Sequence, residues 1–122
     1  MLPNKLKVPL DAANRLRMLQ GRTGLTPNLV CRFALAFSLA DESEPDIPAS
    51  SDDGREFNRY TLFGEHERLY EALLVSRYRK IETALIVAHL TRGIAQLSVR
   101  VKSLTDLLTL AGPEEQASLR QE

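Results

Sequence analysis

The chain has 122 residues, of which 43% are hydrophobic and 26% are charged, so it has the size and composition of one globular domain rather than two. Sixteen basic and sixteen acidic side chains cancel, and the total charge therefore favours neither an acidic nor a basic partner. The distribution is uneven, because residues 1–39 carry six basic groups and one acid while residues 40–72 carry ten acids and three bases. The amino-terminal third is therefore a candidate contact for a polyanion.

Residues 5–10 read Lys-Leu-Lys-Val-Pro-Leu, and this alternation predicts a short strand with Lys5 and Lys7 facing outward. Pro9 cannot donate a ladder hydrogen bond, so the strand ends there or lies at an edge. Residues 1–39 contain no second strand for it to pair with. We therefore expect it to pair with its copy from a second chain, which makes dimerisation a requirement of folding.

Two helices are predicted next, over residues 12–22 and 27–40. Gly24 fits a left-handed helix end, and Thr26 followed by proline is typical of a helix start. The second helix is apolar on all sides except at Arg32, so we expect another chain to cover part of it. Strand, helix, glycine turn and helix together form a ribbon-helix-helix-like pattern.

The rest of the chain is predicted to be mainly helical after an acidic interruption. Residues 41–56 hold seven acids and two prolines, which indicates a flexible acidic linker. Residues 57–64 fit either an extended stretch or a turn, and the tail over 114–122 is expected to fray. The predicted helices are residues 65–92, 94–101 and 104–111. The expected fold is thus a single mainly α domain over residues 1–122, which forms an oligomeric helical assembly.

The sequence lacks the usual signatures of catalysis and metal binding. His66 and His89 are far apart, and the carboxylates next to His66 would point to other faces of a helix. His89 stands among apolar residues, as core histidines do. Cys31 has only Arg32 near it on its helix, so it is predicted to be a buried structural cysteine. We expect no catalytic residue, no metal, no cofactor and no enzymatic activity.

The single cysteine also excludes an intrachain disulfide. The residues after Met1 do not resemble a secretory signal, and no apolar run of about 18 residues could span a bilayer. We therefore expect a cytoplasmic protein without membrane contact.

The stronger signal in the sequence is a set of basic residues that could bind DNA. The predicted DNA-binding residues are Lys5 and Lys7 on the strand with Arg15, Arg17 and Arg22 on the first helix, all through phosphate contacts. The alternative for the lysines is protection of a strand edge, and for the arginines it is a surface salt bridge. The seven aromatic residues mostly take core-like positions, so duplex or nicked duplex is favoured over single strands. A second basic group could extend the surface: Arg77, Arg79, Lys80, Arg92, Arg100 and Lys102.

Several segments resemble the DndE family of DNA sulfur-modification proteins. They are residues 2–7 (Leu-Pro-Asn-Lys-Leu-Lys), 15–17 (Arg-Leu-Arg), 22–28 (Arg-Thr-Gly-Leu-Thr-Pro-Asn), 31–32 (Cys-Arg) and 58–64 (Asn-Arg-Tyr-Thr-Leu-Phe-Gly). The segment 22–28 is the most specific, and the opening half also resembles small ribbon-helix-helix repressors and antitoxins. The resemblance implies a DNA-binding accessory subunit that favours nicked duplex and assembles as a homotetramer. It also implies partner proteins for replacing a phosphate oxygen by sulfur: a cysteine desulfurase, an iron-sulfur sulfur-transfer protein and an ATPase.

Three alternatives to the accessory subunit stay open. A ribbon-helix-helix repressor or antitoxin would discriminate tightly among duplex sequences, whereas the accessory subunit should bind any sequence with similar strength. A scaffold that never touches DNA would use its basic residues on an acidic partner protein. A nicking enzyme would cleave DNA in a metal-dependent way.

Overall fold

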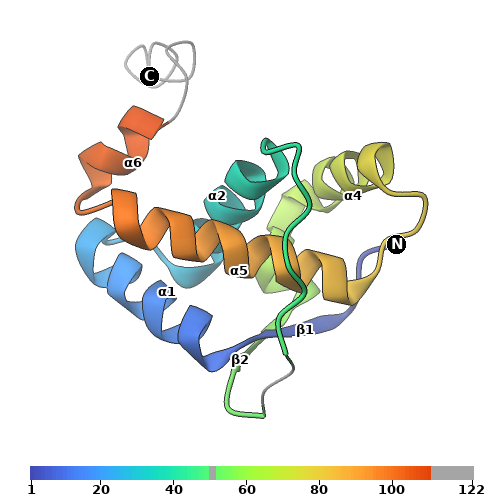
Figure 1. Cartoon of the computed structure of the whole chain (residues 1–122), viewed down its shortest axis with the longest axis horizontal. Helices are drawn as coiled ribbons and strands as arrows, with labels where there is room; N and C mark the ends of the chain where they lie inside the picture. The colour runs from blue at the N-terminus through green and yellow to red at the C-terminus, as the bar shows by residue number, and fades with distance from the viewer. Residues whose placement is uncertain (50–51, 111–122) are drawn as a thin grey trace.

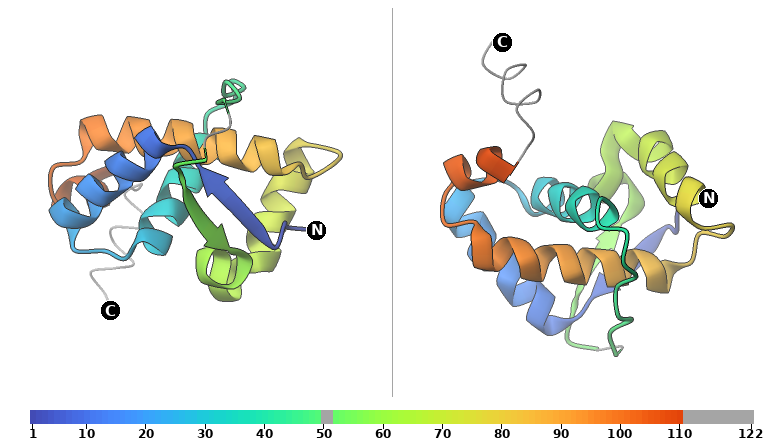
Figure 2. Two further views of the ribbon diagram at one scale, coloured as in Figure 1. Left: turned by 90° about the horizontal axis from the view of Figure 1, so that it is seen from below. Right: turned by 45° about the horizontal axis from the view of Figure 1, so that its top comes forward.

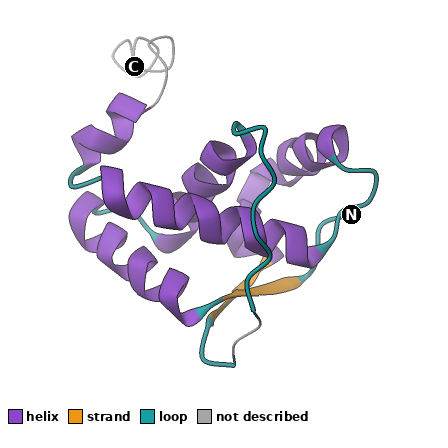
Figure 3. Ribbon diagram, in the orientation of Figure 1, coloured by secondary structure: helices purple, strands orange, loops and turns teal. Residues whose placement is uncertain are grey.

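A computed structural model of the chain describes residues 1–49 and 52–110, and the described residues are mainly helical, as the sequence predicts (Figure 3). In chain order the elements are β1 (Lys5–Val8), α1 (Leu10–Thr23), α2 (Pro27–Leu39), β2 (Arg55–Asn58), α3 (Arg59–Phe63), the short 3₁₀ helix η1 (Gly64–His66), α4 (Glu67–Arg77), α5 (Thr83–Arg100) and α6 (Leu104–Leu110). No described helix combines the length and the apolar character needed to cross a membrane.

The long helix α5 lies at the centre of the fold, with α1 and α2 packed against it (Figure 1). Gly93 lets α2 come close, because a Cβ at this position would collide with the backbone carbonyl of Ala34. The core is formed by buried apolar side chains from every major helix and from the sheet. On α5 these include Ile86, Leu90, Ile94 and Leu97.

The strand β1 pairs antiparallel with β2 of its own chain, and the left view of Figure 2 shows the two strands side by side. Lys5 lies opposite Asn58 and Lys7 lies opposite Glu56. The expectation that β1 has no partner within its chain was therefore wrong. Because β2 supplies hydrogen-bond partners to β1, pairing with a second copy is not needed for this strand to form. The sequence pattern missed β2 because the strand has four residues and follows a polar, acidic stretch. Gly54 allows the close approach, since a Cβ there would collide with the Val8 carbonyl.

The first two helices agree with the predicted ones within a few residues. α1 begins at Leu10, with Pro9 at the N-cap position, and it ends at Gly24, whose φ of 75° is left-handed. α2 begins after Thr26 with proline in its first turn. These two ends were predictable because proline and glycine restrict or permit particular backbone angles.

The predicted helix over residues 65–92 was wrong, because the structure divides it. α4 stops before Tyr78, whose backbone is extended at φ −126° and ψ 142°. α5 then runs through Gly93 without a break as far as Arg100, and it includes all but the last residue of the segment expected as a separate helix over 94–101. Apolar periodicity continues across the break and so concealed it. The residues expected as an extended stretch or turn, 57–64, end β2 and form α3.

The acidic segment that follows α2 passes in front of α5 (Figure 1). Arg77 Nη1 donates to the carbonyl of Asp41 at 2.7 Å, and Arg77 Nη2 donates to the carbonyl of Ser43 at 2.7 Å. Residues 55–56 belong to β2, so the expected linker over 41–56 is shorter than predicted. The tail over 114–122, which was expected to fray, lies outside the described residues.

Candidate nucleic-acid interface

The outer face of the two-stranded sheet carries the two predicted lysines. Leu6 and Val8 are buried under the helices, whereas Lys5 and Lys7 are exposed, so the alternation read from the sequence is confirmed. Among the described residues no carboxylate oxygen lies within 4.0 Å of either lysine ammonium group. Both positive charges therefore face solvent without an ion-pair partner from this part of the chain.

The three predicted arginines of α1 have different surroundings. Arg15 Nε donates to Asp11 Oδ2 at 2.9 Å, and its Nη1 donates to Ser98 Oγ at 2.7 Å. Arg22 Nη1 donates to the carbonyls of Ser98 and Val101 at 2.9 and 3.2 Å. Arg17 is exposed. Arg15 and Arg22 thus tie α1 to the end of α5, and Arg17 is the one of the three that faces solvent.

An arginine outside the predicted set begins the second strand of the ribbon, the two-stranded sheet that β1 and β2 form. Arg55 is exposed at the first position of β2, opposite Val8. Its Nη1 is 3.4 Å from Gln20 Oε1 on α1, and its guanidinium carbon is 5.2 Å from the ring centre of Phe57. The sequence reading placed it in the acidic linker. The available signal for this strand was weak, since Phe57 is its one apolar residue and Asn58 is also the N-cap of α3.

The second basic group is divided among different places in the fold. Arg77 Nη1 donates to the Leu39 carbonyl at 3.0 Å, and Arg92 Nη2 donates to the Ser38 carbonyl at 2.8 Å, so both cap the end of α2. The exposed members flank opposite ends of α5, whose 18 residues span about 27 Å. Arg79 and Lys80 precede the helix, and Arg100 and Lys102 stand at its end.

His89 is a core residue, as predicted. The Ser38 hydroxyl lies 2.9 Å from its Nδ1, and the Tyr78 hydroxyl lies 2.7 Å from its Nε2. The Tyr78 hydroxyl donates its single hydrogen to Glu44 Oε2 at 2.6 Å, so it must accept a hydrogen bond from His89. The ring hydrogen of His89 is therefore on Nε2, and Nδ1 accepts from the Ser38 hydroxyl. Burial, together with nearby guanidinium groups, lowers the pKa of His89 to about 4. The imidazole is therefore neutral near pH 7 and closed to solvent.

Cys31 is also buried, which confirms its prediction as a structural cysteine. Burial raises the pKa of its thiol to about 12, so the thiolate needed for sulfur chemistry is disfavoured. Within residues 1–49 and 52–110, no cluster of three or more histidine, cysteine, aspartate or glutamate side chains has the arrangement of a metal site.

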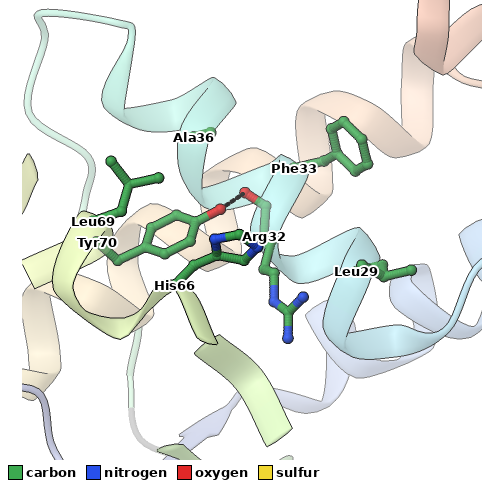
Figure 4. Close-up of a pocket in the computed structure, with 7 residues that line it drawn as sticks. All are labelled: Leu29, Arg32, Phe33, Ala36, His66, Leu69 and Tyr70. Atoms are coloured by element: carbon green, nitrogen blue, oxygen red, sulfur yellow. Dashed lines mark hydrogen bonds between the residues drawn. The ribbon is translucent and has the colours of Figure 1, made fainter. Parts of the chain in front are cut away.

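A shallow, mainly apolar pocket of about 290 Å³ lies between α2 and α4 (Figure 4). Arg32 Nε in its wall donates to the Leu62 carbonyl at 2.7 Å, and the Tyr70 hydroxyl donates to the Arg32 carbonyl at 3.3 Å. Phe33 and Leu69 are 41% and 55% exposed at its rim. The polar groups here join α2 to α3 and α4.

The fold and surface define a small helical protein with an exposed cationic ribbon. The chain matches the family model described as DNA sulphur modification protein DndE over residues 5–105, and it therefore belongs to the DndE family, which is involved in DNA phosphorothioation.

Two solved structures are similar to this chain. DndE from Escherichia coli B7A, described as involved in DNA phosphorothioation modification, is 29% identical with a TM-score of 0.69, over 78% of this chain and 98% of that one. A DndE variant with two glycines replaced by lysine, described as involved in DNA phosphorothioation, is 27% identical with a TM-score of 0.64, over 79% of this chain and 97% of that one. No curated protein matches the chain.

Proposed function

We propose that this protein is a DNA-binding accessory subunit of the phosphorothioation system, which holds duplex or nicked duplex DNA by its phosphate backbone. The observation that carries the proposal is the outward pair Lys5 and Lys7 on the ribbon, exposed and without a carboxylate within 4.0 Å among the described residues. Lysine contacts to phosphate give affinity without reading sequence. The DndE family membership supplies the process that such binding would serve.

In this proposal the sulfur chemistry belongs to partner enzymes and not to this chain. The buried thiol of Cys31 supports this assignment, because its raised pKa opposes formation of a nucleophilic thiolate. The neutral, enclosed imidazole of His89 supports it too, since a general base must reach its substrate.

We also expect the subunit to act as a homo-oligomer, with a tetramer as the expected state. Support comes from large apolar side chains that are exposed on the neighbouring helices α2 and α4. Phe33 is 41% exposed, Leu69 is 55% exposed and Leu73 is 40% exposed. Exposed apolar groups that lie together favour contact with another chain.

A competition titration tests the proposed DNA binding. The wild-type protein is titrated with labelled nicked duplex, and the competitors are intact duplex, single strands and duplexes of different sequence. The proposal predicts similar competition by all duplex sequences, stronger competition by nicked duplex and weaker competition by single strands. Strong preference for one sequence would favour a repressor instead. Absence of binding at low ionic strength would favour the scaffold.

A further inference from the structure

The backbone of β1 pairs with β2 at every second residue. The Arg59 N–H donates to the Asn4 carbonyl at 2.9 Å, and these two residues stand opposite each other when the register of the ribbon is continued by one position. Hydrogen-bonded pairs alternate with non-bonded pairs along an antiparallel ladder. The backbone groups of Leu6 and Val8 therefore point to β2, and those of the two lysines point to the other edge of β1.

This other edge of β1, which we call the open edge, consists of the N–H and C=O groups of Lys5 and Lys7. The described sheet has two strands in the order β1–β2, so no described strand covers the open edge. No described residue makes another hydrogen bond to these backbone groups, and both lysines are exposed. Two donors and two acceptors are thus available to an added strand.

A mainly apolar pocket of about 420 Å³ lies beside the open edge. Lys7 and Pro9 line it from the end of β1, and Ala84 and Val87 line it from the first turns of α5. Ile47, which is 62% exposed, lines it from the acidic segment. Because alternate side chains of a strand lie on one face, a strand added at the open edge can place an apolar side chain in this pocket.

The charges of the ribbon decide which strand the open edge can accept. The outer face carries Lys5, Lys7 and one carboxylate, that of Glu56 opposite Lys7, so it keeps a net positive charge. A second copy of β1 with its apolar residues on the buried face would add lysines beside these lysines, and like charges on adjacent strands oppose pairing. A strand with acidic residues at these positions would gain opposite-charge pairs instead.

We propose that the open edge binds an extended segment of a partner protein that pairs antiparallel with β1, directs acidic side chains toward Lys5 and Lys7, and places an apolar side chain in the pocket. Strand addition of this kind obtains affinity from main-chain hydrogen bonds and specificity from side chains. The inference goes beyond the proposed function, because it assigns a protein partner to backbone groups that phosphate contacts do not use. Carboxylates and phosphates would contact the same ammonium groups, so the protein should hold one of the two ligands at a time.

The test uses the full chain and the synthetic peptide acetyl-Glu-Val-Glu-Val-Glu-amide, with amide hydrogen exchange of β1 followed by NMR. In the free protein the amides of Lys5 and Lys7 should exchange fast, and those of Leu6 and Val8 should exchange slowly. With about nine tenths of the protein bound to peptide, exchange at both lysines should slow about tenfold, because only the free fraction exchanges. The peptide N-methylated at its glutamates lacks the donors to the open edge and should not slow exchange.

The matched variants are Lys7→Gln and Lys7→Pro. Both remove the ammonium group, and only proline also removes the N–H at the open edge, which takes no part in the pairing with β2. Lys7→Gln should bind the peptide about two- to fivefold more weakly than the wild type, through loss of one opposite-charge pair. Lys7→Pro should bind about two- to tenfold more weakly still, through loss of one hydrogen bond.

Three results would each overturn the inference: unchanged exchange at both lysines in excess peptide, equal peptide binding by the two Lys7 variants, and equal binding of the N-methylated peptide. Slow exchange of Lys5 and Lys7 in the free protein would overturn it too, because a second copy or another segment would then cover the edge. If Lys7→Pro fails to fold, the exchange pattern and the N-methylated peptide still decide. None of these measurements contains DNA, so their failure would leave the proposed function standing.

Discussion

His89 is enclosed between α2 and the loop that follows α4, and both of its ring nitrogens have partners. Because Nδ1 accepts from Ser38 and Nε2 donates to Tyr78, the hydrogen-bond network is complete with a neutral imidazole. A second proton would add a charge inside the core and remove the acceptor that Ser38 uses. Protonation of this residue should therefore oppose folding.

The free energy of unfolding should depend on His89 in a defined pH range. Its pKa is about 4 in the folded protein, below its ordinary 6.5, so between these values the unfolded chain binds more protons. Stability is then present above pH 6.5 and is lost as the pH falls toward 4, by at most about 1.4 kcal/mol per pH unit. Urea unfolding at pH 7 and pH 5 measures this loss.

The matched variant for this measurement is His89→Gln. It should be less stable than the wild type at pH 7, because a buried network loses one of its partners. It should also lose less stability between pH 7 and pH 5. Equal pH dependence in both proteins would refute the assignment.

Two helical glycines show why an element cannot be judged from its own sequence alone. Gly21 in α1 has open space where a side chain would stand, whereas Gly93 in α5 faces the backbone of Ala34. Gly21→Ala should therefore raise the free energy of unfolding by about 0.5–1 kcal/mol. Gly93→Ala should lower it by at least about 1–3 kcal/mol, because α2 must move away. Thermal or urea unfolding of both variants checks the prediction, and a stabilising Gly93→Ala would contradict the packing of α2 on α5.

The elements that could be predicted are those with local signals. Gly24 marks the end of α1, Thr26 with its proline marks the start of α2, and the outward lysines follow from the alternation in β1. The strand β2 and the break at Tyr78 could not be predicted, because their causes are contacts with distant segments.

The same limit applies to the candidate interface. The exposure of Lys5 and Lys7 was predictable from the alternation along β1. It was not predictable that Arg15 and Arg22 bond to α5 while Arg17 stays exposed. Arg15 and Arg22 bond to groups 83 and 76 residues further along the chain, and no local pattern encodes these partners. Arg55 was missed for a related reason, since its place beside α1 depends on strand pairing.

At the scale of the whole molecule, the exposed apolar side chains of α2 and α4 bear on assembly. Phe33→Asp should convert the proposed oligomer to smaller species, because a carboxylate buried between subunits would have no partner. The fold should survive, since Phe33 is already 41% exposed in a single chain. Light scattering gives the mass, and circular dichroism gives the helical content.

The control for assembly is Met18→Asp on α1, where the side chain is 44% exposed. This variant should keep the wild-type mass. A monomeric wild-type protein at micromolar concentration, or equal loss of mass in both variants, would contradict the assignment of the subunit contact to α2 and α4.

The central claim is that the ribbon binds DNA phosphates, and the salt dependence of binding tests it most directly. The double variant Lys5→Ala with Lys7→Ala is compared with Lys80→Ala with Lys102→Ala, which removes two exposed lysines outside the ribbon. The account predicts a slope of log K against log salt that is less steep by roughly 0.9 per lost contact in the ribbon variant alone, at unchanged oligomeric mass. A ribbon variant that keeps the wild-type slope would contradict it.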